Sequence, residues 1–298
     1  MKKTIISFCL FSILLVTNIL YASTFMYVTD QTGIKRYNMD TGQYLGVFAE
    51  TSDVLQGIET GPDGNLYTAF NGVKRYNSMT GEYMGVFASH SSINNAVDLA
   101  FGPDGNLYVS SHLTSEIYRF NSTTGDFIDV FANNSGLLSG PTGLTFGPDN
   151  KLYVSSHWGH KILRYDIYTR QEEQIASVTS PHDIVFDANN FFYVTAYLDD
   201  TLYKYDINGV LQETFDSNGE LDRPGGMEFY ANGDLYIANK TTIMQLDGSG
   251  LNQFAPVDGE DIYARYVVFQ THNINAIPEP LSIILLFSGL LAVIKKYK

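Results

Sequence analysis

The sequence predicts an all-β fold, a six-bladed β-propeller with four-stranded blades, and three observations support this prediction. A motif, Gly-Pro-Asp-Gly-Asn-Leu-Tyr, occupies residues 61–67 and 102–108 and returns at 147–153 with Asn-Lys in place of Gly-Asn. Its final tyrosine recurs every 40 to 45 residues, which is the period of a propeller blade. The last repeat is followed by one extra strand, which the first repeat lacks. The six tyrosines are Tyr27, Tyr67, Tyr108, Tyr153, Tyr193 and Tyr236.

The motif predicts the first two strands of each repeat as a hairpin. A run that is mostly apolar ends seven residues before each of the last five tyrosines, and a second apolar run contains the tyrosine itself. Gly and Asn between the two runs tolerate the positive φ that tight turns require. We therefore expect a strand, a tight turn and a second strand.

The rest of each repeat predicts two more strands. A third run alternates apolar with basic or polar residues and ends at Asn or Asp, and a turn such as Thr80-Gly81 and a fourth run such as 83–87 follow it. Four short strands rich in Tyr, Val, Ile and Phe are typical of a propeller blade. Lys and Arg recur at fixed places in the third run, and we interpret them as structural charges at the blade edges. The third runs span 34–38, 73–77, 117–121, 162–166, 202–206 and 243–247.

The two ends of the repeat region predict how the ring closes. The first repeat begins at Tyr27 with a second strand, whereas residues 264–269 form a first strand with nothing behind it. We expect this C-terminal strand to pair with the N-terminal blade, because closure removes open sheet edges.

The N-terminus predicts export. Two lysines precede an apolar stretch over residues 5–20, which is typical of a secretory signal peptide cleaved after Ala22. The alternative is an uncleaved membrane anchor. Cys9, the only cysteine, lies in this segment, so the mature protein cannot form an internal disulfide.

The C-terminus carries a second targeting pattern. Pro278, Glu279 and Pro280 precede an apolar run over 281–294 and a basic end over 295–298. The run has 14 residues, fewer than the roughly 20 that span a bilayer comfortably. This arrangement resembles the PEP-CTERM sorting signal. The resemblance implies transient membrane anchoring, an exosortase-type processing enzyme as partner, and delivery to the cell envelope or extracellular matrix of a Gram-negative bacterium. A plain tail anchor is the alternative.

These patterns divide the chain into a signal peptide (1–22), a propeller (23–277) and a sorting tail (278–298). The whole chain has 18 basic and 32 acidic residues, a net charge of −14, and removing both ends leaves about −18. Such a surface repels phosphate backbones, so we expect no nucleic-acid partner. We expect a monomer.

Over residues 25–270 the repeats resemble six-bladed propellers of the NHL, gluconolactonase and streptogramin-lyase type. The resemblance implies the fold, whereas that group contains lyases, hydrolases, sugar binders and scaffolds. Streptogramin lyases have Trp or Phe where this chain has the motif tyrosines, and no stretch here matches their paired catalytic Glu and His. Lyase activity is therefore not carried over.

Histidines predict a site at the mouth of the central channel, where strand one starts and strand two ends. His112, His157 and His182 fall on this face in three successive blades, with Asp98 and Asp183 close by. Imidazole and carboxylate suit a divalent metal such as Zn, Mn or Ca, which could activate water. His112, His157, His182 and Asp98 are thus candidate metal ligands. The alternative is that each histidine is a repeat relic bonded within its own blade.

One loop, residues 157–160, contains Trp158, the sole tryptophan. An exposed indole suits stacking on a sugar, although it can equally pack on the adjacent blade. Two functions follow: an exported binding or scaffold module for a polysaccharide, peptide or protein, or alternatively a metal-dependent lyase or hydrolase at the mouth. The candidate ligand-binding residues are His112, His157, Trp158, His160, His182 and Asp183.

Overall fold

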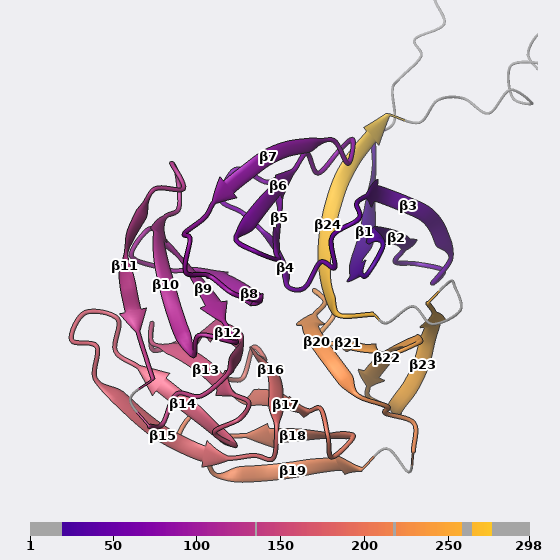
Figure 1. The fold of residues 1–298 in the computed structure, drawn as a ribbon. Helices are drawn as coiled ribbons and strands as arrows, with labels where there is room; N and C mark the ends of the chain where they lie inside the picture. Colours follow the sequence, from indigo (N-terminus) through magenta and orange to yellow (C-terminus); the bar gives the residue numbers. More distant parts are fainter. Residues whose placement is uncertain (1–19, 135, 217–218, 258–263, 276–298) are drawn as a thin grey trace, which may run out of the picture. The chain divides into compact units, whose positions relative to one another are not determined.

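The computed structural model describes residues 20–134, 136–216, 219–257 and 264–275, and these form six four-stranded antiparallel sheets arranged in a ring (Figure 1). The predicted six-bladed propeller is confirmed. Within the described ranges no helix is long and apolar enough to cross a membrane. Residues 1–19 of the predicted signal peptide and the whole predicted sorting tail lie outside the described residues.

Each blade is built from strands in the predicted order, with the first strand innermost (Figure 1). Blade 1 contains β24 (Tyr266–Asn275), β1 (Leu20–Asp30), β2 (Gly33–Asn38) and β3 (Tyr44–Glu50). Blade 2 contains β4 (Ile58–Thr60), β5 (Leu66–Ala69), β6 (Val73–Tyr76) and β7 (Tyr83–Ala88). Blade 3 contains β8 (Ala96–Phe101), β9 (Asn106–Ser111), β10 (Glu116–Asn121) and β11 (Phe127–Ala132).

The other three blades repeat this arrangement, as Figure 1 shows. Blade 4 contains β12 (Pro141–Phe146), β13 (Leu152–Ser156), β14 (Lys161–Tyr165) and β15 (Glu172–Ser177). Blade 5 contains β16 (Pro181–Phe186), β17 (Phe192–Ala196), β18 (Thr201–Tyr205) and β19 (Leu211–Asp216). Blade 6 contains β20 (Pro224–Phe229), β21 (Leu235–Asn239), β22 (Thr242–Asp247) and β23 (Gly250–Pro256).

The ring closes as predicted, with the C-terminal strand β24 beside β1 in blade 1. The backbone just before β24 also bonds to both sides of the closing seam. Arg265 N donates to Thr29 O of blade 1 at 2.9 Å, and Gly226 N of blade 6 donates to Arg265 O at 2.5 Å. Ala264 N donates to Lys240 O, also in blade 6, at 2.7 Å. This short segment therefore holds the first and last blades together.

The repeated motif works as a tied turn. Asp63 accepts hydrogen bonds from the backbone N of Asn65 at 3.1 Å and from the Tyr67 hydroxyl at 3.1 Å. A Cβ on Gly61 would lie 2.2 Å from the Tyr67 ring, and Gly64 has a φ of +77°, so both positions favour glycine. The turn thus fixes the buried tyrosine that packs between blades.

The recurring arginines of the third strand complete this unit, as predicted for structural charges. In three successive blades an arginine lies near the motif aspartate, where it balances the carboxylate under the turn. The pairs are Arg75–Asp63 at 3.7 Å, Arg119–Asp104 at 3.9 Å and Arg164–Asp149 at 3.8 Å.

Around the channel, glycine alternates with larger residues at one equivalent position of each blade. A Cβ on Gly57 would lie 2.4 Å from Asp98 Oδ1, and a Cβ on Gly143 would lie 2.7 Å from Asp183 Cα. Each larger side chain therefore occupies space that the preceding blade leaves open. In order round the ring, the six residues are Gly57, Asp98, Gly143, Asp183, Gly226 and Tyr266.

This packing predicts that Gly143→Ala destabilises the fold. The added Cβ meets backbone as well as side-chain atoms of Asp183, and overpacking of this kind costs about 1–3 kcal/mol. We expect thermal denaturation to show a Tm lowered by several degrees. Gly248→Ala is the matched control, because its Cβ would meet nothing within 4 Å and its φ is not positive. Equal Tm values for the two variants would contradict the packing argument.

Candidate functional site at the channel mouth

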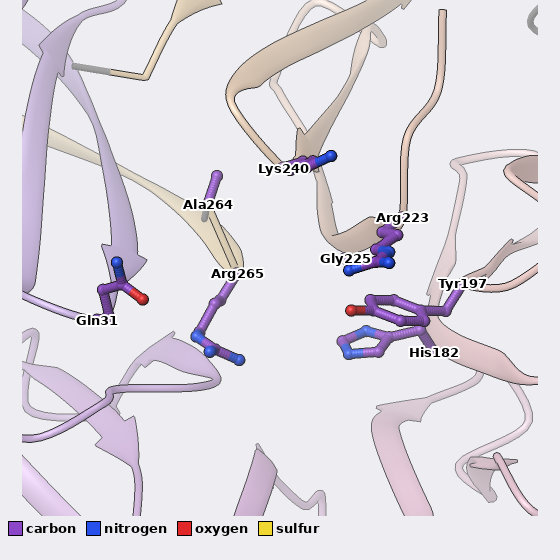
Figure 2. A pocket seen from close by; sticks show the side chains of 8 residues that line it. All are labelled: Gln31, His182, Tyr197, Arg223, Gly225, Lys240, Ala264 and Arg265. Atoms are coloured by element: carbon purple, nitrogen blue, oxygen red, sulfur yellow. The ribbon is translucent and has the colours of Figure 1, made fainter. Parts of the chain in front are cut away.

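A cavity of about 320 Å³ lies at the mouth, where strand one begins and strand two ends (Figure 2). Blades 5, 6 and 1 all contribute residues, which lie at strand ends or in the loops beside them. Six of the eight lining side chains can form hydrogen bonds. The lining residues are His182 and Tyr197 from blade 5, Arg223, Gly225 and Lys240 from blade 6, and Gln31, Ala264 and Arg265 from blade 1.

Arg265 is the partly buried cation of this cavity. Its Nη1 donates to Gln56 Oε1 at 3.0 Å, whereas its Nε is buried and has no hydrogen-bond partner among the described residues. Burial lowers the pKa of Arg265, but a guanidinium starts so high that it stays charged. The Nη2 of Arg265 is not buried and has no hydrogen-bond partner among the described residues, so it is the donor that can reach the cavity.

Arg223 and Lys240 lie across the cavity from Arg265 in Figure 2. Arg223 is exposed and has a φ of +52°, in a loop position where Asn95, Gly140 and Ser180 stand in other blades. Left-handed backbone disfavours a long side chain, so arginine here is a costly choice.

The third cation, Lys240, is paired. It donates to Asp222 at 2.5 Å, but Asp222 does not line the cavity. No acidic side chain is among the described residues that form the cavity wall. The wall is therefore positive, although the chain as a whole has a net charge of −14.

His182 and Tyr197 form a stacked pair in the cavity wall. Their ring centroids are 5.6 Å apart at 24°, and His182 Nδ1 is buried without a hydrogen-bond partner among the described residues. Burial, together with the nearby His157 and Arg265, lowers the pKa of His182 to about 3. At neutral pH His182 is therefore an uncharged hydrogen-bonding group.

The structure brings His112 and His157 together beside the cavity, with ring centroids 5.7 Å apart. His112 in turn lies 4.2 Å from Trp158, and His157 lies 6.2 Å from Tyr197. Together with His182, these rings form a continuous row across part of the mouth. The His157 ring nitrogen Nδ1 is also bonded to Pro181 O of the next blade at 3.1 Å.

The other two residues of the predicted loop differ in role. Trp158 is 47% exposed, and a Cβ on Gly140 would lie 2.6 Å from its ring, so one indole face packs on a loop while part of the ring meets solvent. His160 does not line the cavity. Its Nδ1 accepts from Ser180 N at 2.9 Å, which ties two loops together.

Asp98 and Asp183 tie neighbouring blades. Asp98 Oδ2 accepts from Leu144 N at 2.8 Å, and Asp183 Oδ2 accepts from Met227 N at 2.6 Å. Among the described residues, no three His, Cys, Asp or Glu side chains form a group that could hold a metal ion. A metal at the predicted histidines and Asp98 stays a prediction.

The same two aspartates line a second cavity of about 50 Å³ in the channel, together with Glu59 and Glu228, which the sequence analysis missed. Burial raises the pKa of Glu59 and of Asp183 to about 7. Burial first, and neighbouring carboxylates next, hold the pKa values of Asp98 and Glu228 well above the ordinary range. The position of the two glutamates in the repeat could have predicted this location, because each glutamate stands two residues after a glycine of the alternating ring and therefore points to the same side of the strand.

These shifts predict that Glu228→Gln stabilises the protein more at pH 8 than at pH 5. The pKa of Glu228 is higher in the folded than in the unfolded chain, so its contribution is present at low pH and is lost as pH rises through the folded value. Neutral Gln removes that loss. Tm measured at both pH values tests this, with the exposed Glu82→Gln as control. A gain in Tm that is the same at both pH values would refute it.

No protein-family model matches the chain, and no curated protein matches it by sequence. Solved structures match the fold. A catalytically inactive virginiamycin B lyase from Staphylococcus aureus with quinupristin has 16% identity and a TM-score of 0.58, covering 81% of this chain and 78% of that chain. A chain of the nidogen/laminin complex has 14% identity and a TM-score of 0.69, covering 83% and 98%.

A protein of unknown function from Bacteroides caccae matches with 14% identity and a TM-score of 0.63, again covering 83% of this chain and 98% of that chain. At these identities the likeness establishes the shared propeller fold alone. The likeness therefore says nothing of what the site binds, and only the residues of the site bear on that.

Proposed function

We propose that this protein is an exported binding module that holds an extracellular ligand at the channel mouth. The observation behind the proposal is the 320 Å³ cavity lined by hydrogen-bonding side chains from three blades. Recesses of about 300 Å³ and above, with a few convergent polar groups, are typical of small-ligand sites. Loops on a rigid scaffold are also where binding residues concentrate.

The structural neighbours are compatible with this proposal. One similar fold was solved with quinupristin and another in a nidogen/laminin complex, so propellers of this kind accompany both small and macromolecular partners. For the present chain we favour a polysaccharide, because Trp158 and Tyr197 offer rings that suit stacking on sugars.

A metal-dependent lyase or hydrolase is the second candidate, favoured by the adjacent His112 and His157. Burial lowers the pKa of both imidazoles, and a neutral imidazole is the form that binds a metal. Calorimetric titration of the protein with zinc, manganese and calcium separates the two functions. Binding of all three weaker than millimolar would end the metal-dependent candidate.

Delivery belongs to the same proposal. The predicted signal peptide at 1–22 and the predicted sorting tail with Pro278, Glu279 and Pro280 support export, processing by an exosortase-type enzyme and retention at the envelope or in the matrix. A polysaccharide binder delivered there would meet its ligand outside the cell.

We predict that Tyr197→Ala weakens saccharide binding by about fivefold or more, since loss of a central aromatic contact commonly costs more than about 1 kcal/mol. Calorimetry against a panel of neutral and acidic oligosaccharides measures this. Tyr168→Ala is the matched control, because Tyr168 is 77% exposed in a turn at the opposite face. Equal losses in the two variants, or no binding of any saccharide by the wild type, would overturn the proposed site.

A further inference from the structure

We infer that the ligand is an acidic polysaccharide, one whose sugars carry carboxylates, and that a carboxylate sits between Arg265 and Arg223. This inference rests on the proposed function, because it names the chemical class of ligand for the same cavity. Three features of the site support it: the charge of the wall, the accessible donor of Arg265, and the row of rings beside the cavity.

The wall concentrates positive charge against the composition of the chain. Residues 23–277 contain 13 basic side chains against 31 acidic ones, yet three of the 13 line this cavity: Arg223, Lys240 and Arg265. Neither Arg223 nor Arg265 has an ion-pair partner among the described residues, whereas most other arginines lie within 4.0 Å of a carboxylate. Two arginines without an ion-pair partner, in an acidic protein, favour an anion at this site.

The orientation of Arg265 fits a carboxylate. Gln56 takes Nη1, and Nη2 is left accessible without a hydrogen-bond partner among the described residues. Nη2 can therefore donate a charge-assisted hydrogen bond to a carboxylate oxygen, which is stronger than a bond between neutral groups. In Figure 2 the side chains of Arg223, Tyr197 and His182 stand across the cavity from Arg265, where they can reach the same ligand.

The surroundings favour a saccharide over an acidic peptide. Only Gly225 and Ala264 of the lining residues lack hydrogen-bonding side chains, so the cavity has no apolar pocket for a peptide side chain. His182 is neutral, and its other ring nitrogen, Nε2, is not buried, so Nε2 can bond to a sugar hydroxyl. Outside the cavity, the row of rings that ends at the half-exposed Trp158 offers flat surfaces to the neighbouring sugars of a chain.

The test compares oligogalacturonate with its neutral methyl ester, using calorimetry on the purified protein. We expect the acid to bind about tenfold or more tightly than the ester, since each tenfold step corresponds to about 1.4 kcal/mol. Arg265→Gln and Arg223→Gln should each lose most of this preference. Lys151→Gln is the matched control, because it removes one positive charge from the turn before β13, on the opposite face. The preference should persist from pH 6 to 8, because arginine rather than imidazolium supplies the charge.

The outcomes distinguish failure of the acidic-ligand inference from failure of the proposed binding function. Equal affinity for acid and ester, with both lost in Tyr197→Ala, would overturn the anionic ligand and leave the binding site standing. Tighter binding of oligoglutamate than of oligogalacturonate would overturn the saccharide assignment. Loss of the preference as pH rises from 6 to 8 would assign the charge to a group that titrates in that range and overturn the role of the arginines. Arg265 lies where blades 6 and 1 meet, so the Arg265→Gln variant could fail to fold, which its Tm would reveal. In that case the Arg223→Gln variant alone decides the test.

Discussion

The close packing of the six innermost strands around the channel is the constraint on which the rest of this structure depends. At one position of each strand, glycine alternates with a larger residue from blade to blade. Gly57, Gly143 and Gly226 leave the space that the larger residue of the next blade fills. Asp98 and Asp183 use that space to accept backbone hydrogen bonds two blades beyond those glycines. Protein interiors pack as densely as crystals of small molecules, so a methyl group added at one of these glycines would collide with the neighbouring blade. The ring therefore sets the spacing of every loop at the mouth.

This arrangement separates two kinds of charge along the channel. Carboxylates with raised pKa values face inward, where burial makes a full negative charge unfavourable. Arg223 and Arg265 lie at the mouth, where solvent still reaches part of the site. Asp98 and Asp183 bond to neighbouring blades, whereas Arg223 and Arg265 have no ion-pair partner among the described residues.

The sequence was sufficient to predict the fold because the fold is local and repeated. The Asp63-to-Tyr67 bond, the glycine beneath the tyrosine ring and the arginine beside the turn all lie within one repeat, so each copy reinforces the pattern. Strand exchange between the termini followed from counting these units.

The site was harder to predict, because its residues are far apart in the chain. His182 was selected and does line the cavity, whereas His160 and Asp183 belong to loop and blade contacts. Arg265 was missed because residues 264–269 were predicted only as the closing strand, although it occupies the same repeat position as His182 and lies just before β24. Arg223 was also missed, because the loop before strand one has a different residue in each blade. An arginine does not by itself predict the left-handed backbone that it has there. Only the closed ring brings these side chains together.

The closing seam has a consequence for endurance outside the cell. No disulfide can lock this ring, because the one cysteine is Cys9. Separation of blades 6 and 1 would break the backbone bonds that Arg265 makes to both of them. A ligand that binds both Arg265 of blade 1 and Arg223 of blade 6 would link the two blades. It would thereby slow unfolding and proteolysis for as long as it stays bound. Occupancy would then set the lifetime of the protein, so that unoccupied copies are cleared first.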